Sequence, residues 1–291
     1  MPQISTTGQL ENASGELIDA ARYTAEHNAP VFGLAGQFTL KKGQDTAVFP
    51  KVGQMSFSDL QEGTDIVDEE DIGMSTVSVT PSEVGAKIIL SDKLLRQNMA
   101  VTFQMIGRQL GEGYTRKRED DLISLFSALN GGTSHGAAAA AFSAANVTSV
   151  VGIAKTDKYG DNNAIVQHPN AVMRLAKDLS TIGSGTIRPL PEGYSARLLG
   201  KAFKGFMIWD VPVFESGNIT RDSSDDAIGA IINKGDCLGV LQSSSYTTER
   251  ERDASLRAWE VVATADYVAF ELDDSRGAPL TYDAADPSTS A

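Results

Sequence analysis

The sequence has one cysteine, three histidines and no long apolar run, and each scarcity excludes a class of protein. A lone cysteine, Cys237, cannot form an internal disulfide, which fits a chain made in a reducing cytoplasm. No apolar run approaches the roughly 18 residues of a membrane-spanning helix. The first residues are polar and lack the basic-then-apolar order of a secretory signal. We therefore expect a soluble cytoplasmic product.

Basic residues are also few, with 25 Lys and Arg against 38 Asp and Glu, for a net charge of −13. Proteins that grip DNA through its phosphates need clustered basic side chains, so this balance argues against that role. It is compatible with enclosing DNA, because an acidic wall repels phosphates, and equally with acidity that only maintains solubility. With 291 residues, 41% of them hydrophobic, the chain can bury a core in one large domain or two ordinary ones.

The residues that bind metals and cofactors do not cluster. His27, His135 and His168 are dispersed, and Cys237 has no second cysteine near it. The acidic stretch 62–71 lacks the glycine and ordered oxygens of a calcium-binding loop, which favours a solvated or partner-facing run over a weak calcium site. Phosphate-binding glycine motifs are absent as well. We expect no metal site and no cofactor.

One short motif suggests an enzyme. Residues 132–136 match the G-x-S-x-G pattern, which would make Ser134 the nucleophile of a hydrolase. That chemistry needs a strand before the serine and a helix after it. Here a predicted helix precedes the motif, and only His168 follows as a candidate base. We expect no enzyme, with a Ser134 hydrolase as the alternative.

Residues 46–80 predict a long hairpin with an acidic tip. Its two arms alternate apolar and polar residues, as strands with one apolar face do, for example at Met55 and Phe57 and at Val77 and Val79. The tip contains the candidate interface carboxylates Glu62, Asp65, Asp68, Glu69, Glu70 and Asp71. Such a hairpin cannot bury its own apolar face, so we expect it to lie on another surface.

The longest helix is predicted from about 101 to 129, with Ser91 and Asp92 as a plausible N-cap before it. Gly107 and Gly111 share one face, which predicts close backbone packing there unless they are simply poor helix formers. The basic side chains Arg116, Lys117 and Arg118 can pair with the adjacent residues 119–121, or they can receive the acidic tip of a neighbouring chain. We take the second as an interface hypothesis.

The remaining segments predict a mixture of helices and strands. The alanine-rich stretch 133–149 is typical of a loop or a weak helix, and a helix is expected from about 170 to 179. Strands are expected near 164–167, 203–214, 227–232 and 259–274. The fold class is therefore α+β.

Several of these segments, in this order, resemble the major capsid proteins of tailed bacteriophages with the Hong Kong 97-like fold. VTPSEVGAKIILSDKLLRQ is similar to that family's strand leading into its spine helix, and FSALNGG to the end of that helix. IVQHPNAVMRLAKDL resembles its Asn-Pro helix, with His168 where Asn is usual. LLGKAFKGFMIWDVPVFES and TTERERDASLRAWEVVATADYVAFEL resemble its Val-Pro-Val strand and its charged return into the final strands.

The resemblance implies a division of the chain into named parts. They are an N-terminal arm (1–38), an extended E-loop (39–82), a peripheral domain (83–142 with the spine helix, and 249–285 as return strands), an axial domain (143–248) and a tail (286–291).

The resemblance also implies a function. We expect self-assembly into hexamers and pentamers of an icosahedral capsid around double-stranded DNA, in the virion and assembled in the host cytoplasm, without sequence-specific DNA binding or membrane contact. The short start leaves no room for a scaffolding extension, so we expect a separate scaffolding protein, a portal and optional cementing proteins. Lys51 lies in the E-loop, but nothing marks it as a crosslinking residue. An encapsulin-type compartment shell is the alternative.

Overall fold

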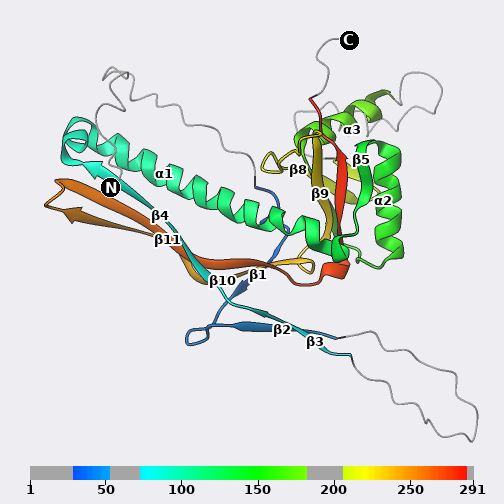
Figure 1. Ribbon diagram of the computed structural model, residues 1–291, viewed down its shortest axis with the longest axis horizontal. Coiled ribbons are helices and arrows are strands. Elements are labelled where there is room, and N and C mark those ends of the chain that lie inside the picture. Colours follow the sequence, from blue (N-terminus) through cyan, green and yellow to red (C-terminus); the bar gives the residue numbers. More distant parts are fainter. Residues whose placement is uncertain (1–28, 53–72, 182–205, 287–291) are drawn as a thin grey trace, which may run out of the picture.

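The computed structural model describes residues 29–52, 73–181 and 206–286, which form two sheets, a long helix and a projecting hairpin (Figure 1). The acidic tip residues 62–71 lie outside the described residues, and so does the segment 15–27, for which the apolar spacing of the sequence predicts a short helix. The predicted α+β class is confirmed by this mixture of elements.

The first sheet has four strands in the order β1-β10-β11-β4, formed by Gly36–Thr39, Leu238–Asp253, Ala258–Glu271 and Ser82–Ser91. Along β11 the side chains of Val261, Ala263, Ala265 and Tyr267 are buried and their neighbours are partly exposed. This period of two places one apolar face of the strand against the helix that crosses the sheet. The sequence predicts a strand over 31–40, but only Gly36–Thr39 forms one, and residues 31–35 form a turn.

That helix is α1, Asp92–Ser124, which runs along the four-stranded sheet and ends beside the six-stranded sheet that is described below (Figure 1). Its N-cap is Ser91, whose hydroxyl accepts the N–H of Leu94 at 3.3 Å. The predicted start near 101 was therefore wrong, because Leu94 and Leu95 already pack in the core with Leu90. The predicted end at 129 was also too late. The chain continues as a 3₁₀ segment, η3 (Phe126–Gly132), in which Asn130 and Gly131 have positive φ.

The glycines of α1 are not at a close contact between described residues. A Cβ built at Gly107, Gly111 or Gly113 meets no atom within 4 Å. The close packing predicted from their spacing is therefore absent within this part of the chain.

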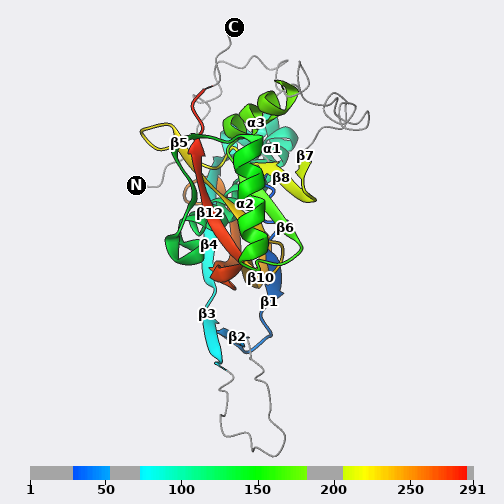
Figure 2. The same cartoon turned by 90° about the vertical axis from the view of Figure 1, so that its right-hand side faces the viewer.

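The second sheet has six strands in the order β5-β12-β9-β6-β8-β7. These strands are His135–Ala141, Gly277–Asp283, Asp226–Asn233, Asn163–Gln167, Val211–Glu215 and Phe206–Ile208. Two helices, α2 (Ala144–Thr156) and α3 (Pro169–Thr181), pack beside this sheet (Figure 2). All five residues of β6 are buried, as in the central strand of a covered sheet.

Two expectations about this unit were wrong. The first part of the alanine-rich stretch is neither a loop nor a helix, because His135–Ala141 forms the edge strand β5, parallel to β12. Only the end of the stretch is helical, as the start of α2. The strand pairing overrides the helix propensity of alanine. In addition, β12 was grouped with the return strands of the first unit, yet it lies between β5 and β9.

The hairpin predicted at 46–80 is present where the structure describes it. Its strands β2 (Ala47–Lys51) and β3 (Ser75–Val79) pair antiparallel, with Phe49 opposite Val77. The expectation that this hairpin has no core of its own chain was wrong at its base. Phe49 and Val79 pack there in a small cluster with Leu241 and Phe270.

Candidate intersubunit surfaces

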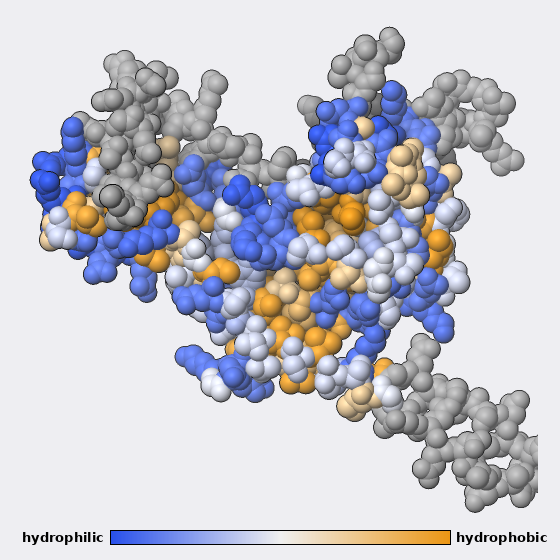
Figure 3. Space-filling model, in the orientation of Figure 1, coloured by the Kyte–Doolittle hydropathy of each residue, from blue (hydrophilic) through white to orange (hydrophobic). Residues whose placement is uncertain are grey.

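The base of the hairpin has one apolar face attached to its own subunit and one facing outward. Phe49 stacks on Phe270 with ring centroids 5.0 Å apart and meets Phe38 edge-on at 4.8 Å. On the opposite side Val48, Val52 and Met74 are 57%, 58% and 63% exposed. Apolar residues continue from the body of the molecule down to the hairpin in Figure 3. The hairpin therefore presents exposed apolar side chains beside the exposed Thr76 and Ser78, on a support that is anchored to its own subunit.

An ion-pair network fixes the hairpin at the same point. The Lys51 ammonium lies 2.5 Å from Asp273 Oδ1 and donates to Ser275 Oγ at 3.3 Å, and Arg276 Nε donates to Asp273 Oδ2 at 3.2 Å. Burial alone would raise the pKa of Asp273, but the hydrogen bonds from Lys51 and Ser275 and the charge of Lys51 hold it below its ordinary value. Lys51 thus joins β2 to the short 3₁₀ segment η4 (Asp274–Arg276) between β11 and β12.

The three basic residues singled out on α1 have different surroundings. Arg116 and Lys117 are exposed, and Lys117 pairs with Asp121 one turn along the helix. Arg118 instead places its guanidinium 3.9 Å from the ring centroid of Phe32 and 4.5 Å from that of Tyr114. The acidic tip that we expected to meet them lies outside the described residues, so that pairing remains a proposal.

Glu119 is a functional candidate that the sequence analysis took only as a local ion-pair partner. It is fully buried and accepts hydrogen bonds from Val31, Phe32 and Ser216. The spacing of the sequence could have indicated the burial of Glu119. It precedes the buried Leu122 and Phe126 by three and seven residues, which puts all three side chains on one helix face.

Ser134 does not have the surroundings of a nucleophile. It follows η3 and precedes strand β5, which reverses the strand-then-helix order that the elbow requires. Its hydroxyl lies 2.8 Å from Thr281 Oγ1 and donates to the Pro279 carbonyl at 3.2 Å, so it joins β5 to β12. His168 is engaged elsewhere, since its Nδ1 accepts the Asn170 N–H at 3.2 Å.

We predict that Ser134→Ala lowers the free energy of unfolding by about 1 kcal/mol, the usual net value of a hydrogen bond. The loss follows from the contacts to β12, so urea unfolding of the subunit should detect it while shell assembly is unchanged. Thr133→Ala is the matched control on the adjacent residue. An esterase activity that disappears in Ser134→Ala would contradict this structural role.

Within the described ranges no group of three or more His, Cys, Asp or Glu side chains is placed to hold a metal ion. His135 Nε2 lies 3.2 Å from the Tyr159 hydroxyl, and His27 is outside these ranges. Cys237 is buried, and burial raises the pKa of its thiol far above the ordinary value. None of the described helices is long and apolar enough to cross a membrane.

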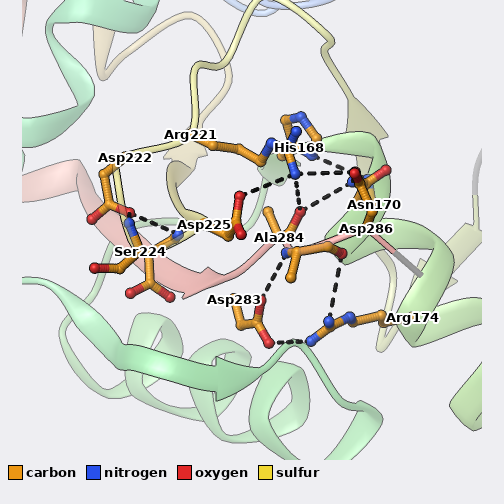
Figure 4. A network of polar contacts seen from close by, with 12 residues as sticks. His168, Asn170, Arg174, Arg221, Asp222, Ser224, Asp225, Asp283, Ala284 and Asp286 are labelled. Carbon is orange, nitrogen blue, oxygen red and sulfur yellow. Dashed lines mark hydrogen bonds and ion pairs between the residues drawn. The ribbon is translucent and has the colours of Figure 1, made fainter. Parts of the chain in front are cut away.

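A polar network closes one end of the six-stranded sheet (Figure 4). Arg174 of α3 pairs with Asp283 at the end of β12, and Arg221 binds Asp286 at 3.0 Å and Asp225 at 3.2 Å. The pKa of Asp283 is lowered by the hydrogen bond from the Ala285 N–H and by Arg174. These contacts join α3, the loop after β8 and the chain after β12, so the network stabilises this end of the six-stranded unit.

The four-stranded sheet with its long helix, the six-stranded sheet and the projecting hairpin together form the Hong Kong 97-like capsid fold. The chain belongs to the phage capsid protein family, whose model matches residues 74–278. The virion capsid is therefore where it acts, by association with further subunits.

Solved structures support the fold. The capsid of cyanophage P-SCSP1u is similar with a TM-score of 0.67 at 14% identity, covering 92% of this chain and 91% of that one. The head of Helicobacter pylori bacteriophage KHP40 gives 0.67 at 11% identity, with 98% of each chain covered. The SrpI encapsulin of Synechococcus elongatus gives 0.63 at 12% identity, covering 96% and 98%. No curated protein matches the sequence.

Proposed function

We propose that this capsid protein assembles into hexamers and pentamers that close an icosahedral shell around packaged double-stranded DNA in a tailed bacteriophage. The observation that carries the proposal is the β2–β3 hairpin, which is anchored on one face by Phe49 and leaves Val48, Val52 and Met74 exposed on the other. Exposed apolar side chains on an anchored projection are suited to burial against another subunit. The net charge of −13 suits a wall that does not bind DNA phosphates.

We assign the parts of the subunit accordingly. The four-stranded sheet with α1 corresponds to the peripheral domain, and the six-stranded sheet, including β12, corresponds to the axial domain. The hairpin is the E-loop. A separate scaffolding protein, a portal and cementing proteins are the expected partners during assembly in the host cytoplasm. The work of such a subunit is structural, and no step of it requires catalysis.

Electron microscopy of the expressed protein, alone and with a candidate scaffolding protein, tests the proposal. Rings or closed shells are expected in at least one condition, and monomers in both would count against it. The encapsulin-like neighbour supports a second candidate, a compartment shell without DNA. A genomic neighbourhood with terminase and portal genes distinguishes the phage function from that alternative.

The exposed basic residues of α1 allow a test of the interface hypothesis. We predict that Arg116→Glu/Lys117→Glu lowers shell yield several-fold at low salt and reverses the effect of salt. The introduced carboxylates would repel an acidic partner surface, and added salt would screen that repulsion and restore part of the yield. Arg118 is spared because it stacks on Phe32. Lys155→Glu/Lys158→Glu, at exposed positions in the last turn of α2 and just after it, is the control with the same charge change. Sedimentation at several salt concentrations measures the yield, and an unchanged salt response would refute the hypothesis.

A further inference from the structure

One buried carboxyl group holds three segments of the subunit together. Glu119 Oε1 accepts the N–H of Val31 at 3.2 Å and the hydroxyl of Ser216 at 3.3 Å, and its Oε2 accepts the N–H of Phe32 at 3.2 Å. Val31 and Phe32 belong to the turn before β1, and Ser216 follows β8. The carboxyl of α1 thus joins the segment that leads out of the N-terminal arm to the six-stranded unit.

The turn that Glu119 holds is 30–35. Leu34 and Ala35 donate their N–H groups to the Val31 carbonyl at 2.9 and 3.1 Å, as in the first turn of a helix. The N–H groups of Val31 and Phe32 stand at the start of this turn, where a helical turn supplies no acceptor. Val31 is also fully buried in the main core. Docking of the turn therefore depends on the Glu119 carboxyl group of α1 as the acceptor. When the turn docks, it covers this carboxyl group and removes it from water.

The donors that meet Glu119 are all neutral. Residues 29–35 and 216–220 contain no ionisable side chain, and Glu215 at the end of β8 is exposed. On α1 itself, Asp120 is negative, and the Arg118 guanidinium lies against the rings of Phe32 and Tyr114. Burial raises the pKa of Glu119 above its ordinary value of 4.5, Asp120 adds to the rise, and the three hydrogen bonds only partly offset it.

The site can also accommodate a neutral carboxyl group. A serine hydroxyl both donates and accepts, so Ser216 can turn to accept a proton from Glu119 Oε1. The Val31 and Phe32 N–H groups keep their acceptor oxygens in that arrangement. Protonation therefore removes a buried charge without breaking the contacts that hold the turn.

We propose that docking of residues 29–35 onto α1 is linked to uptake of one proton, with Glu119 as the group that takes it up. When the turn leaves, Glu119 meets water and its pKa returns toward 4.5. The docked state binds the proton more tightly, so docking is strongest at acidic pH and weakens as the pH rises from 4.5 through the raised pKa. Within that window the docking constant falls by up to about tenfold per pH unit. The hypothesis concerns the single subunit and does not depend on shell formation.

Hydrogen–deuterium exchange on the unassembled full-length subunit from about pH 5 to about pH 8 tests this linkage. Protection of the amides of 31–35 is compared with that of β9 in the same sample, which corrects for the chemical effect of pH. The wild type should lose protection of 31–35 as the pH rises. Glu119→Gln, which imitates the neutral carboxyl, should remove that pH dependence. Constant protection in the wild type, or an unchanged slope in Glu119→Gln, overturns the proposal.

Two further variants allow the linkage to be tested even if Glu119→Gln folds poorly. Ser216→Ala removes a hydrogen bond that favours the carboxylate form of Glu119, so the loss of protection should shift to higher pH, and an unshifted window contradicts the mechanism. Glu112→Gln removes a partly exposed carboxylate that pairs with Arg108 at 2.7 Å on the same helix. This control should behave as the wild type, and a loss of the pH dependence in it would also refute the assignment to Glu119.

Discussion

Phe49→Ala is expected to abolish shell assembly while the subunit stays folded. Phe49 is the side chain of β2 that contacts both Phe38 and Phe270, with ring centroids 4.8 and 5.0 Å away. Removing a half-buried aromatic ring and its two ring contacts costs about 2 kcal/mol. The equilibrium constant for docking of the hairpin on its own subunit then falls roughly 30-fold. Every subunit of a shell makes this contact, so the loss of docking free energy is repeated in each subunit and adds up over the shell.

Hydrogen–deuterium exchange should show faster exchange of β2 and β3 in Phe49→Ala, and electron microscopy should show few or no shells. Phe49→Leu is the matched control, because it keeps an apolar side chain of similar reach against Phe270 and should retain most assembly. Normal shell yield in Phe49→Ala would refute the role given to the aromatic anchor. Global unfolding of the variant would show instead that the hairpin base belongs to the folding core.

Phe126→Ala is expected to cause the largest loss of stability, about 3–5 kcal/mol in the free energy of unfolding. Phe126 is fully buried where α1 gives way to η3, in the core that also contains Leu122 and the central strands of the six-stranded sheet. Truncation there leaves a cavity at the point where the long helix meets that sheet, and the helix has few other contacts with it.

Guanidinium unfolding of the unassembled subunit, followed by circular dichroism, measures this loss as a lower transition midpoint. Ser127→Ala changes the adjacent exposed residue and should leave the midpoint nearly unchanged. A Phe126→Ala midpoint within error of the wild type would show that the junction is not a main source of stability. Assembly at low temperature tests whether a weakened junction still permits closed shells.

Local patterns in the sequence were sufficient for much of the fold. Period-two alternation located β3, the segment that follows His168-Pro169 was predicted as the helix α3, and Ser91 is the N-cap of α1. These features depend on neighbours a few residues away, which is why the sequence carries them. The order of such segments was also enough to indicate the capsid family, which the match over 74–278 established.

Long-range contacts decided the features that the sequence analysis missed. The alanine-rich strand β5 exists because β12, more than 130 residues later, supplies its hydrogen-bonding partner at Leu280 and Thr281. Glu119 was taken as a surface charge, because its burial depends on Val31 and Ser216, 88 and 97 residues away.

The hairpin illustrates both sides of this division. Its strands and the apolar face that contains Val77 and Val79 were predicted from alternation alone, since period two is a property of an isolated strand. Its anchoring was not, because Phe270 and Asp273, which hold Phe49 and Lys51, lie more than 200 residues away. The sequence by itself determined that a projecting hairpin would need a partner. Only the tertiary structure decided which face is already occupied within the subunit and which remains for a neighbour.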